Sequence, residues 1–373
     1  MKMTTLMTCL IGISLAGCDK NDQRVETDEV NVQYVMPAES DLHEGTWLQW
    51  PQKYQYGVTY RDRLEPTWIA MSKEIVSGEN LHIIAYNEEA KNRIITQLKE
   101  AQVPMERIDF YIFKTNDVWV RDNGPVFVWA PENKLSIEGW GFNGWGNKEA
   151  YNYDEQIPAE VAQATNTPFV ELNKKLILEG GAVEVDGKGS FLATRSSILN
   201  KNRNPGVTQE YAEELFKQYL GVTHFIWLDG KAGLDITDMH IDGFARFAGE
   251  NTIVTMSAQD LVTWELPQKD ITTLFNAKNK EGKSYNYFIL LLTKNNVVTT
   301  YGKDLGYQGS YVNYYITNDK VLVPNYKDPN DEIANRLIGQ IYPDRKVVGV
   351  DVRNLYANGG MVHCVTQQQP ASK

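Results

Sequence analysis

Residues 87–95 read NEEAKNRII and residues 330–338 read NDEIANRLI. Both have the order Asn, acid, Glu, two free positions, Asn, Arg, aliphatic residue, Ile, and each lies between two apolar runs typical of strands. A third helical stretch, Thr208–Tyr219, has the same context without the letter match. Repeated units of this size predict a closed, propeller-like array. Two surface helices with an Asn cap and an acidic first turn can also look alike for local reasons, and this alternative stays open.

Strand-like and helical stretches alternate on both sides of this pair as far as the C-terminus. No linker rich in Pro, Gly or Ser marks a domain boundary, so a single mixed α/β domain is predicted. Strands are predicted at residues 81–85, 108–113, 225–228, 252–256, 320–323 and 346–350.

Composition and charge limit the classes of molecule that the chain is expected to bind. The chain has 373 residues, 42% of them hydrophobic, which is enough for a large core. Its formal net charge is −11, from 37 basic and 48 acidic residues, and it has no run of basic residues. Nucleic acid is therefore a disfavoured partner, whereas a small cationic molecule suits the overall charge.

The N-terminus has the features of an export signal. Lys2 precedes an apolar run, residues 6–15, that is too short to span a bilayer. The run ends in Leu15-Ala16-Gly17-Cys18, which resembles the lipobox of bacterial lipoproteins. We expect a signal peptide at 1–17, a lipidated Cys18 with a flexible tether at 18–33, and the folded domain at 34–373. The chain would then be an exported lipoprotein anchored at a periplasmic or cell-surface membrane face. An ordinary signal peptide or an uncleaved anchor is the alternative.

Cysteine content isolates one thiol. The sequence contains only Cys9, Cys18 and Cys364, and the first two belong to the expected signal and lipid site. Cys364 then has no partner for an intramolecular disulfide, in a compartment where thiols are normally paired. It is either a reactive residue or a small buried hydrophobic one.

Four segments place turn-forming glycines beside charged or reactive side chains. Glycine pairs permit close backbone approaches, so such segments often line sites. In a repeat fold they are expected to converge on one axis. The segments are residues 117–125 (DVWVRDNGP), 178–181 (LEGG), 238–243 (DMHIDG) and 359–364 (GGMVHC).

His240 and Asp242 are two residues apart, so in an extended strand they share one face, an arrangement suited to acid–base work beside a cation. On the same reasoning His363 points away from Cys364, and no catalytic role is predicted for it. The scattered histidines and the absence of Cys-x-x-Cys favour no metal site. The remaining histidines are predicted to be structural: His43, His82 and His224.

A thiol with an upstream imidazole and several acids has the parts for covalent catalysis. Carboxylates repel anions but hold a planar cation through paired, charge-assisted hydrogen bonds. This combination points to a guanidinium substrate.

Several motifs, taken in order, resemble the agmatine deiminase and bacterial peptidylarginine deiminase family of guanidino-modifying enzymes. The resemblance covers about residues 36–370, nearly the whole expected mature chain. Any one motif is weak, and the ordered set is specific. The matching segments are 36–39, 43–47, 50–51, 119–125, 140–146, 178–181, 200–205 and 363–370.

This resemblance implies a fivefold pseudo-symmetric α/β propeller, or pentein, of ββαβ-type repeats, without metal or organic cofactor. It implies that Asp122 and Asp242 grip the guanidinium nitrogens and that Glu179 pairs with the substrate and with His240. His240 would act as general acid and then base. Cys364 would attack the guanidinium carbon, and the thiouronium intermediate would be hydrolysed to a ureido product.

The substrate's far end is less well defined. Trp119 matches a position that lines the aliphatic arm, with a core aromatic as the alternative. Met239, Gly243 and Met361 stand where the agmatine enzymes commonly have Gly, Asn and Asn. The two Met side chains are expected to reshape the pocket there.

Three functions remain. The leading hypothesis is deimination of agmatine to N-carbamoylputrescine and ammonia. A related hypothesis is deimination of an arginyl peptide. A catalytically silent lipoprotein that binds a cation is the alternative from another class. Homo-oligomerisation stays open.

Overall fold

The computed structural model describes residues 34–372. The expected signal peptide, lipidated Cys18 and tether lie outside the described residues. Within residues 34–372, no helix combines the length and apolarity needed to cross a bilayer.

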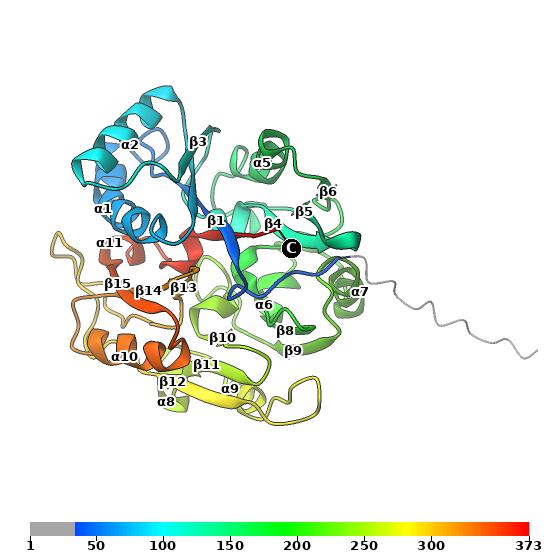
Figure 1. Ribbon diagram of the computed structural model, residues 1–373. Coiled ribbons are helices and arrows are strands. Elements are labelled where there is room, and N and C mark those ends of the chain that lie inside the picture. Colours follow the sequence, from blue (N-terminus) through cyan, green and yellow to red (C-terminus); the bar gives the residue numbers. More distant parts are fainter. Residues whose placement is uncertain (1–33, 373) are drawn as a thin grey trace, which may run out of the picture. The chain divides into compact units, whose positions relative to one another are not determined.

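The strands of residues 34–372 form five sheets (Figure 1). In four sheets, an antiparallel pair is extended by a third, parallel strand. These four sheets comprise β4 (Val126–Ala130), β5 (Lys134–Gly139) and β6 (Phe169–Glu171); β7 (Val183–Val185), β8 (Ser190–Thr194) and β9 (His224–Leu228); β10 (Ala245–Phe247), β11 (Thr252–Met256) and β12 (Asn286–Leu290); and β13 (Tyr315–Ile316), β14 (Lys320–Asn325) and β15 (Lys346–Asp351).

The remaining sheet joins the two ends of the described chain. Its order is β16 (Gln367–Pro370), β1 (His43–Gln49), β2 (Asn80–Ala85) and β3 (Ile108–Ile112). β16 pairs antiparallel with β1, and the other two pairings are parallel. The predicted fivefold pseudo-symmetric α/β propeller is thus confirmed, with one extra strand in this sheet.

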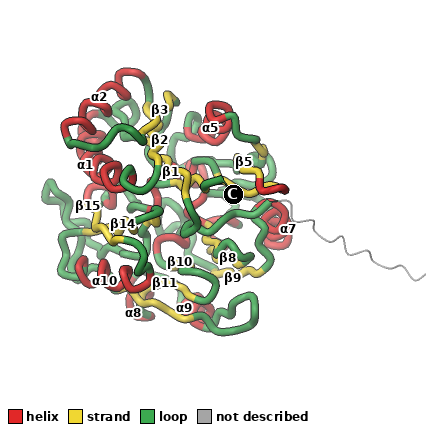
Figure 2. The backbone as a smooth tube through the Cα atoms, in the orientation of Figure 1, coloured by secondary structure: helices red, strands yellow, loops and turns green. Residues whose placement is uncertain are grey.

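Helices connect the parallel strands and lie on the outer side of the sheets (Figure 2). Because parallel neighbours need a crossover, each sheet has at least one such helix. The crossover helices are α1 (Val58–Ile75), α2 (Glu88–Glu100), α5 (Ile157–Thr165), α7 (Gln209–Tyr219), α8 (Ala258–Thr263), α9 (Gln268–Phe275) and α10 (Asp331–Ile341). Shorter helical pieces are α4 (Gly144–Asn147), α6 (Arg195–Ile198), α11 (Arg353–Tyr356), and the 3-10 turns η1 (Pro131–Asn133) and η2 (Asp154–Gln156).

Helix α7 illustrates why these residues form these elements. The Thr208 side chain caps its first turn by accepting a hydrogen bond from the Tyr211 N–H. Its buried residues recur at helical spacing, so one stripe packs on the sheet and the rest of the helix meets solvent. The buried stripe is Ala212, Leu215, Phe216 and Tyr219.

The predicted strands are confirmed, with ends displaced by at most two residues. The similarity between 87–95 and 330–338 does not mark equivalent positions in the repeat, however. Counted from the antiparallel pair, α1 occupies in its sheet the place that α10 occupies in another, whereas α2 leads to the extra strand β3. The Asn87 side chain accepts a bond from the Ala90 N–H at 2.8 Å, but Asn330 makes no such cap. The repeat is real, although these two helices are not equivalent members of it.

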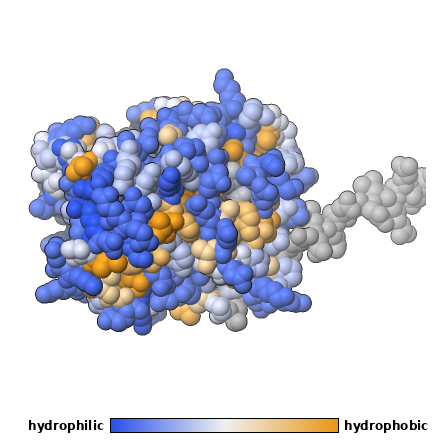
Figure 3. All heavy atoms as spheres, turned by 90° about the horizontal axis from the view of Figure 1, so that it is seen from above, coloured by the Kyte–Doolittle hydropathy of each residue, from blue (hydrophilic) through white to orange (hydrophobic). Residues whose placement is uncertain are grey.

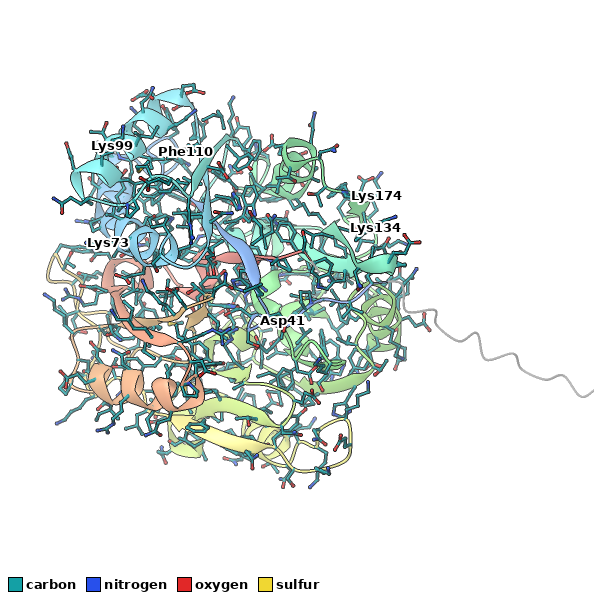
Figure 4. All side chains as sticks on the ribbon, viewed as in Figure 1. Asp41, Lys73, Lys99, Phe110, Lys134 and Lys174 are labelled. Carbon is teal, nitrogen blue, oxygen red and sulfur yellow. The ribbon has the colours of Figure 1, made fainter. Side chains whose placement is uncertain are left out.

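The surface agrees with the charge analysis. The face in Figure 3 is largely hydrophilic, with small separate hydrophobic areas. Lys73 and Lys99 lie on α1 and α2, while Lys134 and Lys174 lie near each other in this view, beside β5 and β6 (Figure 4). These four lysines form two pairs in the view, unlike the continuous basic stripe of a nucleic-acid-binding face.

Candidate active site

The four glycine-rich segments each contain a short helical turn, and these turns pack on one another. Turn α3 contacts η3 and η5, and η3 contacts η4. Each turn leads directly into the antiparallel strand of a different sheet, namely β4, β7, β10 or β16. The repeat therefore brings together residues far apart in sequence, as predicted. The turns are α3 (Val120–Asn123), η3 (Gly180–Ala182), η4 (Ile241–Gly243) and η5 (His363–Val365).

His240 lies between two buried carboxylates. Its Nε2 is 3.0 Å from Glu179 Oε2, and its Nδ1 is 3.6 Å from Asp122 Oδ1. Asp122 is itself fixed, because Oδ1 accepts from the Gly181 N–H at 3.0 Å and Oδ2 from Trp145 Nε1 at 2.9 Å. The imidazole is thus held in one orientation.

Cys364 completes the group. Its Sγ lies 3.8 Å from Asp242 Oδ2, and Nδ2 of Asn313 lies 3.4 Å from the sulfur. Cys364, His240 and Asp242 line one cavity of about 620 Å³. Asp122 and Glu179 lie behind His240, outside the cavity wall formed by the described residues.

Gly181 allows this close packing. A Cβ atom there would lie 2.7 Å from His240 Nδ1, 2.8 Å from Asp122 Oδ1 and 3.1 Å from Asp242 Oδ2. Three polar atoms from two segments, 117–125 and 238–243, therefore surround the bare face of this glycine. A larger residue would push them apart.

Burial and the clustered acids shift the proton affinities. Burial lowers the pKa of His240, but Asp122, Glu179 and Asp242 outweigh it and raise that pKa to about 9. Burial, aided by Asp242 and Asp122, raises the pKa of the Cys364 thiol well above its usual value. At neutral pH the unliganded site therefore holds an imidazolium beside a protonated thiol.

The carboxylates respond differently. Burial raises the pKa of Asp122 to about 6; His240 opposes this rise, and Asp242 and Glu179 add to it. For Asp242, burial also favours the neutral acid, but the hydrogen bond and charge of His363 lower its pKa below the usual value. Asp242 therefore favours the ionised form, which binds a cation.

A second layer of cations supports the acids. The buried guanidinium of Arg203 donates to Glu179 Oε1 at 3.0 Å and also contacts Asp238. Lys148 Nζ lies 2.8 Å from that same aspartate. Arg203 lies within a motif that marked the family resemblance, so a signal for it was present in the sequence.

The extended conformation expected around the reactive residues is wrong. His240 precedes the 3-10 turn η4, which contains Asp242, and His363 begins the 3-10 turn η5. His363 consequently does not point away from the site, since its Nδ1 lies 2.8 Å from Asp242 Oδ2. Backbone turns after glycine-rich segments overrode the strand alternation on which that prediction rested.

Asn313 was missed by sequence reasoning. It follows no glycine pair, yet it precedes β13, the antiparallel strand of its sheet, as the four turns precede theirs. Its Nδ2 also donates to the Asp242 backbone carbonyl at 3.2 Å. Only the assignment of the fifth repeat would have identified it.

Of the residues predicted to lie near the substrate's far end, some line the cavity and others do not. Gly243 and Met361 line the cavity, whereas Met239 is buried outside its wall with φ of +75°. That left-handed backbone explains why Gly suits the position. Trp119 is also buried outside the wall; its indole donates to Asp117 Oδ2 at 2.8 Å, and its ring packs on Gly360. Trp119 thus packs as a core aromatic, and its contact with the substrate's aliphatic arm stays a prediction.

The three other histidines have local partners, as a structural role requires. His43 contacts the Glu39 carbonyl and Glu79, and His82 Nε2 lies 2.8 Å from Glu44 Oε2. His224 Nε2 lies 2.7 Å from the Lys278 carbonyl oxygen.

Comparisons with known proteins agree on one family. The family model of the Porphyromonas-type peptidyl-arginine deiminases matches residues 35–370. A Shewanella sp. (strain MR-7) protein named "Putative agmatine deiminase" is 31% identical over 365 residues, covering 91% of this chain and 95% of that protein.

Solved structures show the same fold. The agmatine deiminase of Enterococcus faecalis superposes with a TM-score of 0.80 at 26% identity, covering 91% of this chain and 97% of the other. The Porphyromonas gingivalis protein named "Putative Arginine Deiminase" gives 0.77 at 28% identity, covering 91% and 99%. The chain belongs to the Porphyromonas-type peptidyl-arginine deiminase family and is a hydrolase of guanidino carbon–nitrogen bonds.

Proposed function

We propose that this chain hydrolyses agmatine to N-carbamoylputrescine and ammonia, with Cys364 as the nucleophile. The observation that carries the proposal is that Cys364, His240 and Asp242 line one cavity, with Asp122 and Glu179 held behind the imidazole. A carboxylate that holds a planar cation beside a thiol suits attack of the sulfur at the guanidinium carbon.

The first half-reaction forms a thiouronium. When the substrate cation binds, Cys364 releases its proton to solvent, and the thiolate sulfur bonds to the guanidinium carbon, giving a tetrahedral adduct. His240 donates its proton to one amino nitrogen, the carbon–nitrogen bond breaks, and ammonia leaves. The imidazolium expected at neutral pH is the required form of this acid.

The second half-reaction returns the enzyme to its starting state. Neutral His240 takes a proton from water as the oxygen bonds to the same carbon. The carbon–sulfur bond then breaks, and the hydroxyl proton on the former guanidinium carbon passes to the Cys364 sulfur, leaving the ureido product and the thiol. One water is consumed and one ammonia is released in each cycle.

Binding of the substrate cation favours deprotonation of the Cys364 thiol. Burial and the negative charge of Asp242 raise the pKa of Cys364, and a guanidinium beside Asp242 offsets that charge. Binding and activation are therefore coupled, so the thiolate forms when the substrate is present.

A second candidate substrate is an arginyl peptide. The cavity volume of about 620 Å³ exceeds what an agmatine-sized molecule fills, and the same wall includes Trp264, Glu265 and Tyr307. The agmatine proposal draws on the names of the Shewanella and Enterococcus relatives, and the peptide alternative draws on this space.

A substrate panel separates these candidates. Ammonia and ureido product are measured for agmatine, free arginine and an arginyl peptide at equal concentrations. The proposal expects the highest kcat/KM for agmatine. Turnover of the peptide alone would overturn the agmatine assignment, and no turnover of any guanidine would favour a silent cation-binding protein.

We further propose that the chain is an exported bacterial lipoprotein carrying lipid at Cys18. The support is the sequence Leu15-Ala16-Gly17-Cys18 after a short apolar run. Such an anchor would place the deiminase at a membrane surface, where exogenous guanidines are accessible.

A further inference from the structure

His363 connects the active site to a buried charge cluster. Its Nδ1 is 2.8 Å from Asp242 Oδ2, and its Nε2 is 2.8 Å from Glu39 Oε2. The histidine side chain is 2% exposed, so water competes little for either contact. The imidazole therefore spans two carboxylates, one in the cavity wall and one behind it.

Geometry indicates the charge of this imidazole. Neutral imidazole has one donor nitrogen, whereas imidazolium has two. With both nitrogens at hydrogen-bond distance from carboxylate oxygens, the doubly protonated ring satisfies both acids.

The charged neighbours make the same point. The Arg121 and Arg246 guanidinium groups contact Glu39, and Arg246 Nε also lies 3.3 Å from Glu184 Oε2. When His363 is protonated, three cations face three acids in this buried cluster, which avoids an unpaired buried charge. The charged groups that face it are Asp242, Glu39, Glu184, Arg121 and Arg246.

The contact between His363 and Asp242 is linked to the nucleophile through one carboxylate oxygen. Asp242 Oδ2, which accepts from His363, is also the oxygen 3.8 Å from Cys364 Sγ. Asn313 fixes this segment further, since its Oδ1 accepts from the His363 N–H at 3.0 Å. Movement of the imidazole would therefore displace both the carboxylate and the backbone that carries the nucleophile.

We infer that His363 is a positioning residue: its imidazolium bridges Asp242 and Glu39 and keeps Asp242 ionised and correctly oriented for a substrate cation. This inference rests on the proposed guanidinium hydrolysis. It assigns His363 no proton transfer to substrate, because the imidazole acts through Asp242.

Two isosteric substitutions separate the ends of the bridge. In His363→Asn the amide nitrogen can take the place of Nδ1 and still donate to Asp242, whereas in His363→Gln it can take the place of Nε2 and donate only to Glu39. We expect His363→Gln to lower kcat/KM for agmatine by about 10²-fold, mainly by raising KM, because the misplaced carboxylate no longer binds the cation well. His363→Asn should retain more activity than His363→Gln.

The pH profile distinguishes positioning from structural support. Without the imidazolium, Asp242 binds its proton more tightly, so the acidic limb of kcat/KM should move to higher pH in His363→Gln. Thermal unfolding of each variant reports folding separately. Unchanged acidic limbs in both folded variants, or equal activities of the two, would overturn the inference.

Glu39→Gln provides a second test if His363→Gln fails to fold. This change keeps an acceptor for Nε2 but removes one of the two carboxylate charges that the ring bridges, so kcat/KM for agmatine should fall, mainly through a higher KM. An unchanged KM in folded Glu39→Gln would overturn the inference. Wild-type protein that releases no ammonia would instead sink the proposed function, so the two failures are distinct.

Discussion

At neutral pH His240 is protonated, unlike most of a free imidazole, and the Cys364 thiol holds its proton more tightly than a free thiol does. Against the effect of burial, Asp122, Glu179 and Asp242 raise the pKa of His240 to about 9, while burial, aided by Asp242 and Asp122, raises the pKa of the thiol. A nucleophile kept protonated without substrate is protected from other electrophiles, since the thiolate is the reactive form. Substrate charge then becomes a requirement for reactivity as well as for binding.

This arrangement predicts slow alkylation of the resting thiol. The rate of modification by iodoacetamide should rise with pH and show a midpoint above that of an ordinary cysteine, because burial, Asp242 and Asp122 favour the thiol. The modified Cys364 peptide is quantified by mass spectrometry. Asp242→Asn should lower the midpoint, whereas a wild-type midpoint near neutral pH would contradict the electrostatic account.

Asp122 is the residue whose neutralisation should affect chemistry most directly through His240. Asp122→Asn should lower kcat/KM by about 10²-fold, since charge-assisted bonds contribute roughly 1.5–3 kcal/mol. The asparagine oxygen can replace only one of the acceptors used by Gly181 and Trp145. Steady-state kinetics are compared with those of Asp41→Asn, an exposed control (Figure 4) that should behave as wild type. Equal kcat/KM in both variants would contradict the assigned role.

At the scale of elements, short turns rather than long helices carry the chemistry. Each reactive side chain lies in, or just before, a turn that enters the antiparallel strand of a sheet. The strands fix where a turn begins, and glycine fixes how closely neighbouring turns approach. The repeat thus acts as a device for bringing distant segments together.

A substitution at Gly181 tests whether glycine allows the turns to approach closely. In Gly181→Ala the added Cβ must displace His240, Asp122 or Asp242, so kcat/KM should fall by about 10²-fold. Global stability should change far less than activity. Gly206→Ala is the control, because a Cβ added there would meet no atom within 4 Å, although its φ of +79° carries some strain. Activity in Gly181→Ala equal to that of the control would refute the close approach.

Particular residues show how much the sequence could predict. Apolar runs such as 252–256 located strands correctly, because burial on a sheet leaves a strong local signal. The same period-two logic failed at His363, where a 3-10 turn replaced the expected strand. Asn313 had no local signal, because only its place in the repeat brings it to the sulfur.

At the scale of the whole molecule, the two ends of the described chain depend on each other. β16 follows the nucleophile and pairs with β1, while Glu39, just before β1, contacts His363. Residues near both ends therefore build the same site. Neither half of the described chain contains all the reactive groups.

The proposed membrane anchor makes a separate prediction. Cys18→Ser should move the protein from the membrane fraction to the soluble fraction, because the acyl chains that hold it would be absent. Cys9→Ser, which leaves the lipobox intact, should remain in the membrane fraction. Quantitative blotting of fractionated cells measures both. Membrane retention of Cys18→Ser would contradict lipidation at that residue.

The most direct test of covalent guanidinium hydrolysis compares agmatine turnover by wild-type protein and by Cys364→Ala, with ammonia and N-carbamoylputrescine measured together. The account predicts equal amounts of both products from the wild type and neither above background from a folded Cys364→Ala. Sustained formation of both products by that variant would contradict the assignment of the sulfur as nucleophile.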